Sequence, residues 1–160
     1  MNELTGKIQT EIKKVIVGKD DVVRRVLMAI LAQGHVLLED VPGVGKTTLA
    51  MAFAKTLGLK TARVQFTSDT MPSDIIGFSV YDKDTGKLSY KPGAVMTNLL
   101  LADEINRTSP KTQSALLEVM EERTITVDGE THALPAPFIC IATQNPFGFA
   151  GTQALPESQL

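Results

Sequence analysis

The chain has 160 residues with 21% charged residues and a formal net charge of −2, which argues against a disordered chain and against a broadly basic surface for nucleic acid. Hydrophobic residues make up 43%, as in ordinary globular domains, and no apolar run approaches the ~20 residues that cross a bilayer. The start lacks the long apolar stretch of a signal peptide, and Cys140, the single cysteine, has no partner for an internal disulfide. We therefore expect one domain over residues 1–160 with no second domain, a cytoplasmic location, no membrane insertion and no nucleic-acid partner.

The first part of the chain predicts two helices followed by a strand, a glycine-rich turn and another helix. Apolar side chains recur at helical spacing in the second helix, which Gly34 is expected to end, and Gly58 is expected to end the third. The predicted elements are helices over 3–15, 20–33 and 46–57 and strands over 35–38 and 61–66.

The later part alternates buried strands with helices and adds two hairpins. Ser109 and Pro110 predict the start of a helix, and Asp128-Gly129 predicts a two-residue hairpin turn. The predicted elements are a short helix over 72–76, hairpin strands over 78–81 and 87–90, a strand over 99–102, a helix reaching 122, hairpin strands over 124–127 and 130–134, and a strand over 138–142. Continuous apolar strands that alternate with helices imply an α/β fold in three layers, with a parallel sheet covered on both faces and the hairpins as insertions.

A glycine-rich segment, residues 40–47, follows a predicted strand and opens a predicted helix, which is the context of a phosphate-binding loop, or Walker A motif. Lys46 would reach the β- and γ-phosphates of a nucleotide, and the Thr47 hydroxyl would bind Mg²⁺. Asp40 stands where the strict motif has glycine, and a Gly-Lys-Thr turn also arises by chance, which is the alternative at this point. The further residues expected to contact phosphate are Pro42, Gly43, Val44, Gly45 and Thr48.

Two acidic residues, Asp103 and Glu104, end the apolar strand at 99–102, as in a Walker B element. Ligands of open α/β sheets bind at the carboxyl ends of the strands. Asp103 would hold Mg²⁺, directly or through water, and Glu104 would orient and polarise the attacking water. The alternative is that these acids only cap the next helix.

The last predicted strand also ends in polar residues, and Asn145 lies just after it. Its amide could hydrogen-bond the γ-phosphate or the attacking water, which is a sensor role. Asn145-Pro146 is also an ordinary turn signal, which is the alternative interpretation.

Together these motifs make the chain similar to the MoxR family of AAA+ ATPases, from about Val15 to the last residue. The matching segments are residues 38–47, 101–107, 111–118, 120–123 and 142–146. The resemblance implies a P-loop NTPase that uses ATP and Mg²⁺ and assembles as a hexameric ring. It also implies chaperone-like remodelling or activation of partner complexes, including proteins with a von Willebrand factor A domain. Val17 and Gly18 would then line the adenine site, and the hairpin over residues 78–90 would be the family's insertion, facing the ring pore or the client.

By the same resemblance, the chain stops before an arginine-bearing segment, a fifth core strand and a helical lid. We therefore expect weak ATP hydrolysis by this chain alone and an apolar sheet edge along residues 35–38. Arg107 and Arg123 either act across a subunit boundary or are ordinary surface or helix-end arginines, and His35 and His132 are expected to be strand residues without chemistry. The alternatives for function are a nucleotide-binding interaction module with little turnover and a small-molecule kinase.

Overall fold

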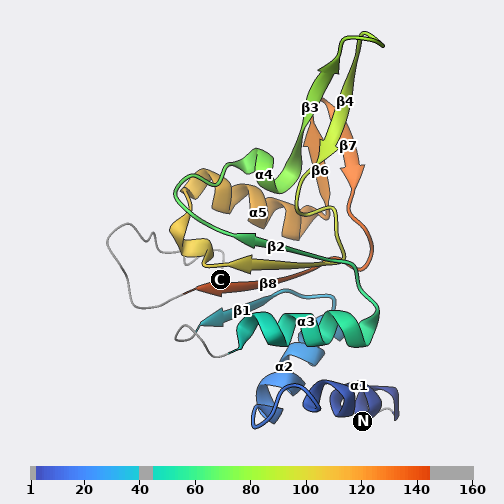
Figure 1. Cartoon of the computed structure of the whole chain (residues 1–160), viewed down its shortest axis with the longest axis vertical. Helices are drawn as coiled ribbons and strands as arrows, with labels where there is room; N and C mark the ends of the chain where they lie inside the picture. Colours follow the sequence, from blue (N-terminus) through green and yellow to red (C-terminus); the bar gives the residue numbers. More distant parts are fainter. Residues whose placement is uncertain (1–2, 40–44, 145–160) are drawn as a thin grey trace.

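The computed structural model describes residues 3–39 and 45–144, and its centre is a four-stranded parallel sheet (Figure 1). The strands lie in the order β1-β8-β5-β2. Their bounds are β1 Val36–Glu39, β2 Thr61–Gln65, β5 Leu99–Asp103 and β8 Ile139–Gln144. This sheet confirms the predicted parallel arrangement.

Helices cover both faces of the sheet, which confirms the three layers. In Figure 1, α1, α2 and α3 lie on one side of the sheet, and α4 and α5 lie on the other. The bounds are α1 Glu3–Lys13, α2 Asp20–Leu31, α3 Lys46–Leu57, α4 Pro72–Ile76 and α5 Pro110–Glu122, with a 3-10 turn, η1, at Ile105–Arg107. Within residues 3–39 and 45–144, no helix combines the length and apolar character needed to cross a bilayer.

The central strands β5 and β8 send alternate side chains into two separate cores. Leu99 and Leu101 of β5 pack with α1, α2 and α3, whereas Leu100 packs with α5 and the base of the hairpins. Both faces are therefore apolar, which explains the continuous hydrophobic runs of these strands. Cys140 of β8 is fully buried, and burial raises the pKa of its thiol to about 12, in agreement with a packing role.

Two antiparallel hairpins project together from the α5 side of the sheet (Figure 1). They are β3–β4 and β6–β7, with bounds β3 Gly77–Asp82, β4 Lys87–Pro92, β6 Thr124–Val127 and β7 Glu130–Ala133. The Tyr90 and His132 rings stack between them at 4.1 Å. At the base of β3–β4, a Cβ on Gly93 would overlap main-chain atoms of Ile75 and Gly77, so only glycine fits there.

The end of α2 differs from the prediction, because Gln33 rather than Gly34 adopts the left-handed backbone, with φ 56°. Arg123 holds Gln33 in this conformation: its Nη1 donates to Gln33 Oε1 at 2.9 Å and its Nη2 donates to the Gln33 carbonyl at 2.8 Å. The helix therefore ends at Leu31. These bonds favour the helix-end role for Arg123 over the role across a subunit boundary.

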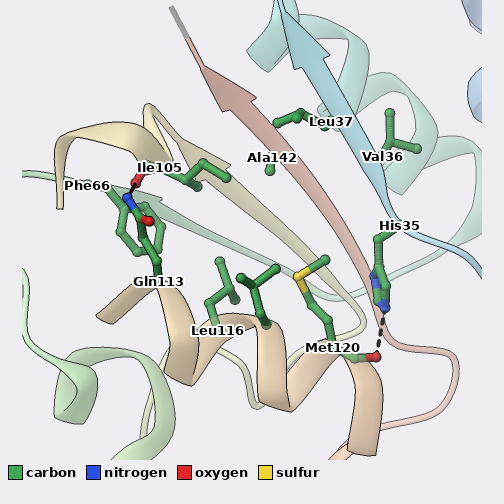
Figure 2. A pocket seen from close by; sticks show the side chains of 10 residues that line it. His35, Val36, Leu37, Phe66, Ile105, Gln113, Leu116, Met120 and Ala142 are labelled. Carbon is green, nitrogen blue, oxygen red and sulfur yellow. Dashed lines mark hydrogen bonds between the residues drawn. The ribbon is translucent and has the colours of Figure 1, made fainter. Parts of the chain in front are cut away.

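Strand β1 lies at one end of the sheet as far as residues 3–39 and 45–144 show, pairing with β8 only. Its apolar side chains are half-buried, in contrast to the buried β5. Beside it, a cavity of about 170 Å³ lies between the sheet and α5, lined mainly by apolar side chains such as Leu37, Leu116 and Met120 (Figure 2). Of the predicted phosphate- and metal-binding residues that the structure describes, none lines this cavity.

His35 connects the start of β1 to both β8 and α5. Its Nδ1 accepts the Cys140 backbone N–H at 3.0 Å. Its Nε2 lies 3.0 Å from the Met120 carbonyl (Figure 2). An Nδ1 that accepts a hydrogen bond carries no proton, so Nε2 is the donor and the ring is neutral. Burial, with the nearby Arg123 charge, lowers the pKa of His35 below its ordinary 6.5. The prediction that His35 is a strand residue differs from the structure by one position, because β1 begins at Val36. The ring contacts β8 and α5 from this position.

The His35 contacts predict a pH-dependent stability. As pH falls through 6.5, the unfolded chain takes up a proton at His35 before the folded chain does, so the free energy of unfolding decreases. The free energy of unfolding of the variant His35→Gln should be about 1–2 kcal/mol lower than that of the wild type near neutral pH, the scale of lost hydrogen bonds to a partly buried group. It should also depend less on pH than that of the wild type between about pH 7.5 and 5.5. Urea unfolding across this range measures both effects, and equal pH slopes for the two chains would contradict the assignment.

Candidate functional site

The carboxyl ends of the four parallel strands place polar side chains along one edge of the sheet. Glu39 of β1 is in register with Gln144 of β8, and the Gln144 amide donates a hydrogen bond to the Glu39 carboxylate. Gln65 of β2 is in register with Asp103 of β5. The parallel strands thus end in groups that can bind a polar ligand, at the edge where open α/β sheets bind their ligands.

The described part of the predicted phosphate loop begins at Gly45, directly before α3. Gly45 has φ 81°, a left-handed conformation that suits glycine, and its carbonyl accepts the Leu49 N–H at 2.9 Å. Lys46, Thr47 and Thr48 form the first turn of α3. Backbone N–H groups of a first helical turn have no partner within the helix and can bind an anion. Pro42, Gly43 and Val44 lie outside the described residues.

A cavity of about 410 Å³ opens beside this helix start. The α1–α2 connection lines it with Val15, Ile16 and Val17. From the start of α3, it is lined by Gly45, Lys46, Thr48 and Leu49. Its volume is in the range of small-ligand pockets. Val17 is thus brought to the same cavity as Lys46, while Gly18 does not line it and instead takes φ 76° in the turn before α2.

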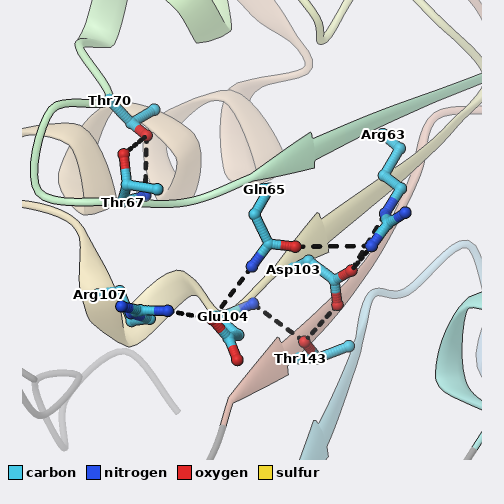
Figure 3. A network of polar contacts seen from close by, with 8 residues as sticks. All are labelled: Arg63, Gln65, Thr67, Thr70, Asp103, Glu104, Arg107 and Thr143. Atoms are coloured by element: carbon cyan, nitrogen blue, oxygen red, sulfur yellow. Dashed lines mark hydrogen bonds and ion pairs between the residues drawn. The ribbon is translucent and has the colours of Figure 1, made fainter. Parts of the chain in front are cut away.

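Asp103 ends β5 with both carboxylate oxygens in hydrogen bonds (Figure 3). Oδ1 accepts from the Thr143 hydroxyl at 2.8 Å. Oδ2 accepts from Arg63, at 2.7 Å from Nη2 and 3.1 Å from Nε. Its side chain is only 13% exposed, so these contacts fix the carboxylate at the end of the strand.

Glu104 follows Asp103 with a left-handed backbone, φ 57°, which is uncommon for a residue with a side chain. Its N–H donates to the Thr143 hydroxyl at 3.0 Å. Its Oε2 accepts from Gln65 Nε2 at 3.0 Å and from Arg107 Nη1 at 2.9 Å (Figure 3). The two acids are therefore turned to different partners, although they are adjacent in sequence.

The Thr143 hydroxyl joins the two acids, since it donates to Asp103 and accepts from the Glu104 backbone. The turn η1 that follows Glu104 is held from the other side by the buried Gln113, whose Nε2 donates to the carbonyls of Ile105 at 3.1 Å and Thr108 at 3.3 Å. Strand β8 and helix α5 together fix the path of the chain through the acidic pair.

The sequence alone predicted no role for three of these residues, Arg63, Gln65 and Thr143. Arg63 and Gln65 alternate along β2, so their side chains share one face of that strand. That pattern signals a polar face, but the pairing of β2 with β5 was needed to place it beside the acids. Asn145, the predicted sensor, lies outside the described residues.

The oxygen donors at this edge suit a magnesium ion that is shared with phosphate. Among residues 3–39 and 45–144, no group of three or more His, Cys, Asp or Glu side chains could hold a metal without other ligands. Mg²⁺ in nucleotide sites takes one or two protein oxygens in addition to phosphate oxygens and waters. Thr47 and Asp103 supply oxygens of the required kind, and the carboxylate of Asp103 is held by Arg63.

Residues 35–160 match the family described as "ATPase family associated with various cellular activities (AAA)". A crystal structure of a candidate ATPase from Cytophaga hutchinsonii superposes with a TM-score of 0.85 and 44% identity, covering 97% of this chain and 47% of that chain. The chain therefore belongs to the AAA ATPase family, with the α/β fold of P-loop NTPases.

Its relatives place it in the MoxR branch of that family. It is 49% identical over 149 residues to the chaperone MoxR1 of Mycobacterium tuberculosis, covering 93% of this chain and 40% of that protein. It is 56% identical over 160 residues to the uncharacterized protein YeaC of Bacillus subtilis, covering 100% of this chain and 50% of that protein. The chain thus spans about half the length of these relatives.

The bridging hydroxyl predicts a specific effect of removing it. In Thr143→Val, Asp103 and the Glu104 N–H both lose their shared partner while the side-chain volume stays nearly constant. Binding of Mg-ATP should weaken about tenfold, the scale of a hydrogen bond to a charged group. Thr143→Ser retains the hydroxyl and should bind close to wild type. Calorimetric titration compares the three proteins, and equal affinity of the valine variant would show that Thr143 does not hold the acids in a binding geometry.

Proposed function

We propose that the chain binds Mg-ATP at the carboxyl edge of its sheet and hydrolyses the γ-phosphate. The observation that carries this proposal is the placement of the Asp103–Glu104 pair at the sheet edge where α3 begins with Lys46 and Thr47. The cavity of about 410 Å³ that Val17 and Lys46 share supplies space for the nucleoside part. Membership of the AAA ATPase family supports the same activity.

Each proposed role uses the chemistry of one side chain. Lys46 contacts the β- and γ-phosphates, Thr47 and Asp103 provide oxygens for Mg²⁺, and the bound Mg²⁺ neutralises charge on the phosphate oxygens. Glu104 orients and polarises the attacking water.

The other predicted residues are proposed to contact the γ-phosphate, the adenine or the phosphate chain. Asn145 contacts the γ-phosphate, while Val17 and Gly18 lie against the adenine. Pro42, Gly43, Val44, Gly45 and Thr48 contact the phosphates.

Glu104 must release its hydrogen bonds to Gln65 and Arg107 before its Oε2 can accept a hydrogen bond from the attacking water. Its Oε2 is bound to Gln65 and Arg107, and its side chain is 28% exposed. Two side-chain donors therefore occupy the oxygen that would otherwise accept a hydrogen bond from water. Release from these two donors is therefore part of the proposed catalytic cycle.

In the whole protein, we propose that ATP turnover drives chaperone-like remodelling or activation of partner complexes by a hexameric ring in the cytoplasm. Proteins with a von Willebrand factor A domain are candidate clients, and the name of the MoxR1 relative, a chaperone, supports this class of output. The β3–β4 hairpin offers a surface for such a client, since Phe78, Tyr81 and Leu88 are exposed on it.

The direct test is the affinity of the chain for Mg-ATP with and without the loop lysine. Lys46→Ala should lose about 1.5–3 kcal/mol of binding free energy, the scale of a hydrogen bond between charged groups. Lys55→Ala, an exposed lysine at the opposite end of the same helix, is the matched control and should bind as the wild type does. Equal affinities of all three proteins in calorimetry would remove the basis for the nucleotide site.

A second arm separates hydrolysis from binding. Glu104→Gln should bind Mg-ATP normally and lose about 10²–10⁴-fold in phosphate release, the usual contribution of a general base. If the wild type binds Mg-ATP but releases no phosphate above the Glu104→Gln level, the chain is an interaction module rather than an enzyme. Phosphate transfer that needs an added small-molecule acceptor would instead indicate a kinase.

A further inference from the structure

Arg63 is a basic residue that points at the acid proposed to bind the metal. It lies in the middle of β2, the strand paired with β5, and its guanidinium makes two contacts with one oxygen, Asp103 Oδ2 (Figure 3). The distances are 2.7 Å from Nη2 and 3.1 Å from Nε. Because Thr143 occupies Oδ1, Arg63 uses the oxygen that would otherwise be available.

A guanidinium and a divalent cation compete for the same carboxylate oxygen. Both are positive, and two such charges within a few ångströms of one another repel strongly at a partly buried carboxylate. The Asp103 side chain is 13% exposed, so solvent screens this repulsion only in part. Arg63 must therefore leave Oδ2 before that oxygen can face a metal ion.

Arg63 is also free to move in a way that Asp103 is not. Its side chain is 55% exposed, and β2 is the last strand of the sheet on that side within residues 3–39 and 45–144. Its contact with Gln65 is a long one, 3.5 Å from Nη2 to Gln65 Oε1. A long side chain with an exposed end can turn into water at little cost, whereas the carboxylate stays fixed by Thr143.

We propose that Arg63 is a reversible latch on Asp103, a positioning residue that holds the acid until nucleotide binds and then releases it. This inference rests on the proposed Mg-ATP site. The negative charges of a triphosphate supply the additional attraction that draws a cation to Asp103 and the guanidinium away. Without those charges, one carboxylate that already has a cationic partner is a poor metal ligand. The latch thus makes metal binding conditional on nucleotide binding.

Binding of Mn²⁺ in the absence of nucleotide tests the latch directly, because Mn²⁺ prefers the same oxygen ligands as Mg²⁺ and free Mn²⁺ is quantified by electron paramagnetic resonance. Arg63→Gln should bind Mn²⁺ about three- to tenfold more tightly than the wild type, the scale of an ion pair between a partly buried and an exposed group. Arg63→Gln/Asp103→Asn should lose that gain. Arg63→Lys keeps the charge, so its Mn²⁺ affinity should lie between the affinities of the wild type and Arg63→Gln.

Arg107→Gln is the matched control. Arg107 is 56% exposed, almost equal to Arg63, and pairs with the neighbouring acid Glu104, so this variant removes the same charge from the same crevice but leaves Asp103 latched. Its Mn²⁺ affinity should stay within about twofold of the wild type, because screening weakens contributions from charges that do not touch the ligand. Thermal unfolding of each variant shows whether it is folded, and Arg63→Lys provides the test if Arg63→Gln is not.

The outcomes separate the latch from the function on which it rests. The latch is wrong if Arg63→Gln binds Mn²⁺ no more tightly than the wild type, or if Arg107→Gln gains as much as Arg63→Gln. If Asp103→Asn alone leaves the affinity for Mn-ATP unchanged, the proposed metal site is wrong as well. If Asp103→Asn loses affinity for Mn-ATP but Arg63→Gln gains no affinity for Mn²⁺, the metal site is supported and the latch is wrong.

Discussion

The pairing of β5 between β2 and β8 is the constraint on which the acidic site depends. Both faces of β5 are buried, so its carboxyl end is the place where the strand can carry charge. Asp103 stands at that end, and the two neighbouring strands reach it from opposite sides with Arg63 and Thr143. The same sheet therefore fixes the position of the acid and supplies the groups that pair with it.

Each of the two acids is paired with one guanidinium, and the two pairs differ in how far apart their members lie along the chain. Arg107 is three residues from Glu104 and belongs to the turn η1, so this pair forms locally. Arg63 meets Asp103 only through the sheet. Thr143 connects the two pairs, because one hydroxyl contacts Asp103 and the Glu104 backbone. A change at either acid can thus be transmitted to the other over a short distance.

Features set by local sequence were predictable, and features set by strand order were not. The Asp128-Gly129 turn, the Ser109 cap of α5 and the two buried strands follow from spacing over a few residues, and the structure has each of them. The left-handed residue at the end of α2 is Gln33 and not the predicted Gly34. Arg123, ninety positions along the chain, donates a hydrogen bond to the Gln33 carbonyl. The contacts of Arg63 with Asp103 likewise needed the order β2-β5-β8. Asn145 and the loop residues before Gly45 lie outside the described residues, so their roles stay predictions.

In the proposed site, Asp103 faces the metal of a nucleotide bound at the start of α3. A crystal structure of the chain with Mg²⁺ and a nonhydrolysable ATP analogue measures this directly. We expect the triphosphate against the first turn of α3, the metal beside Thr47 and Asp103, and Arg63 turned away from Oδ2. An analogue bound elsewhere, or a metal-bound triphosphate at α3 with the Arg63–Asp103 contact intact, would contradict this expectation.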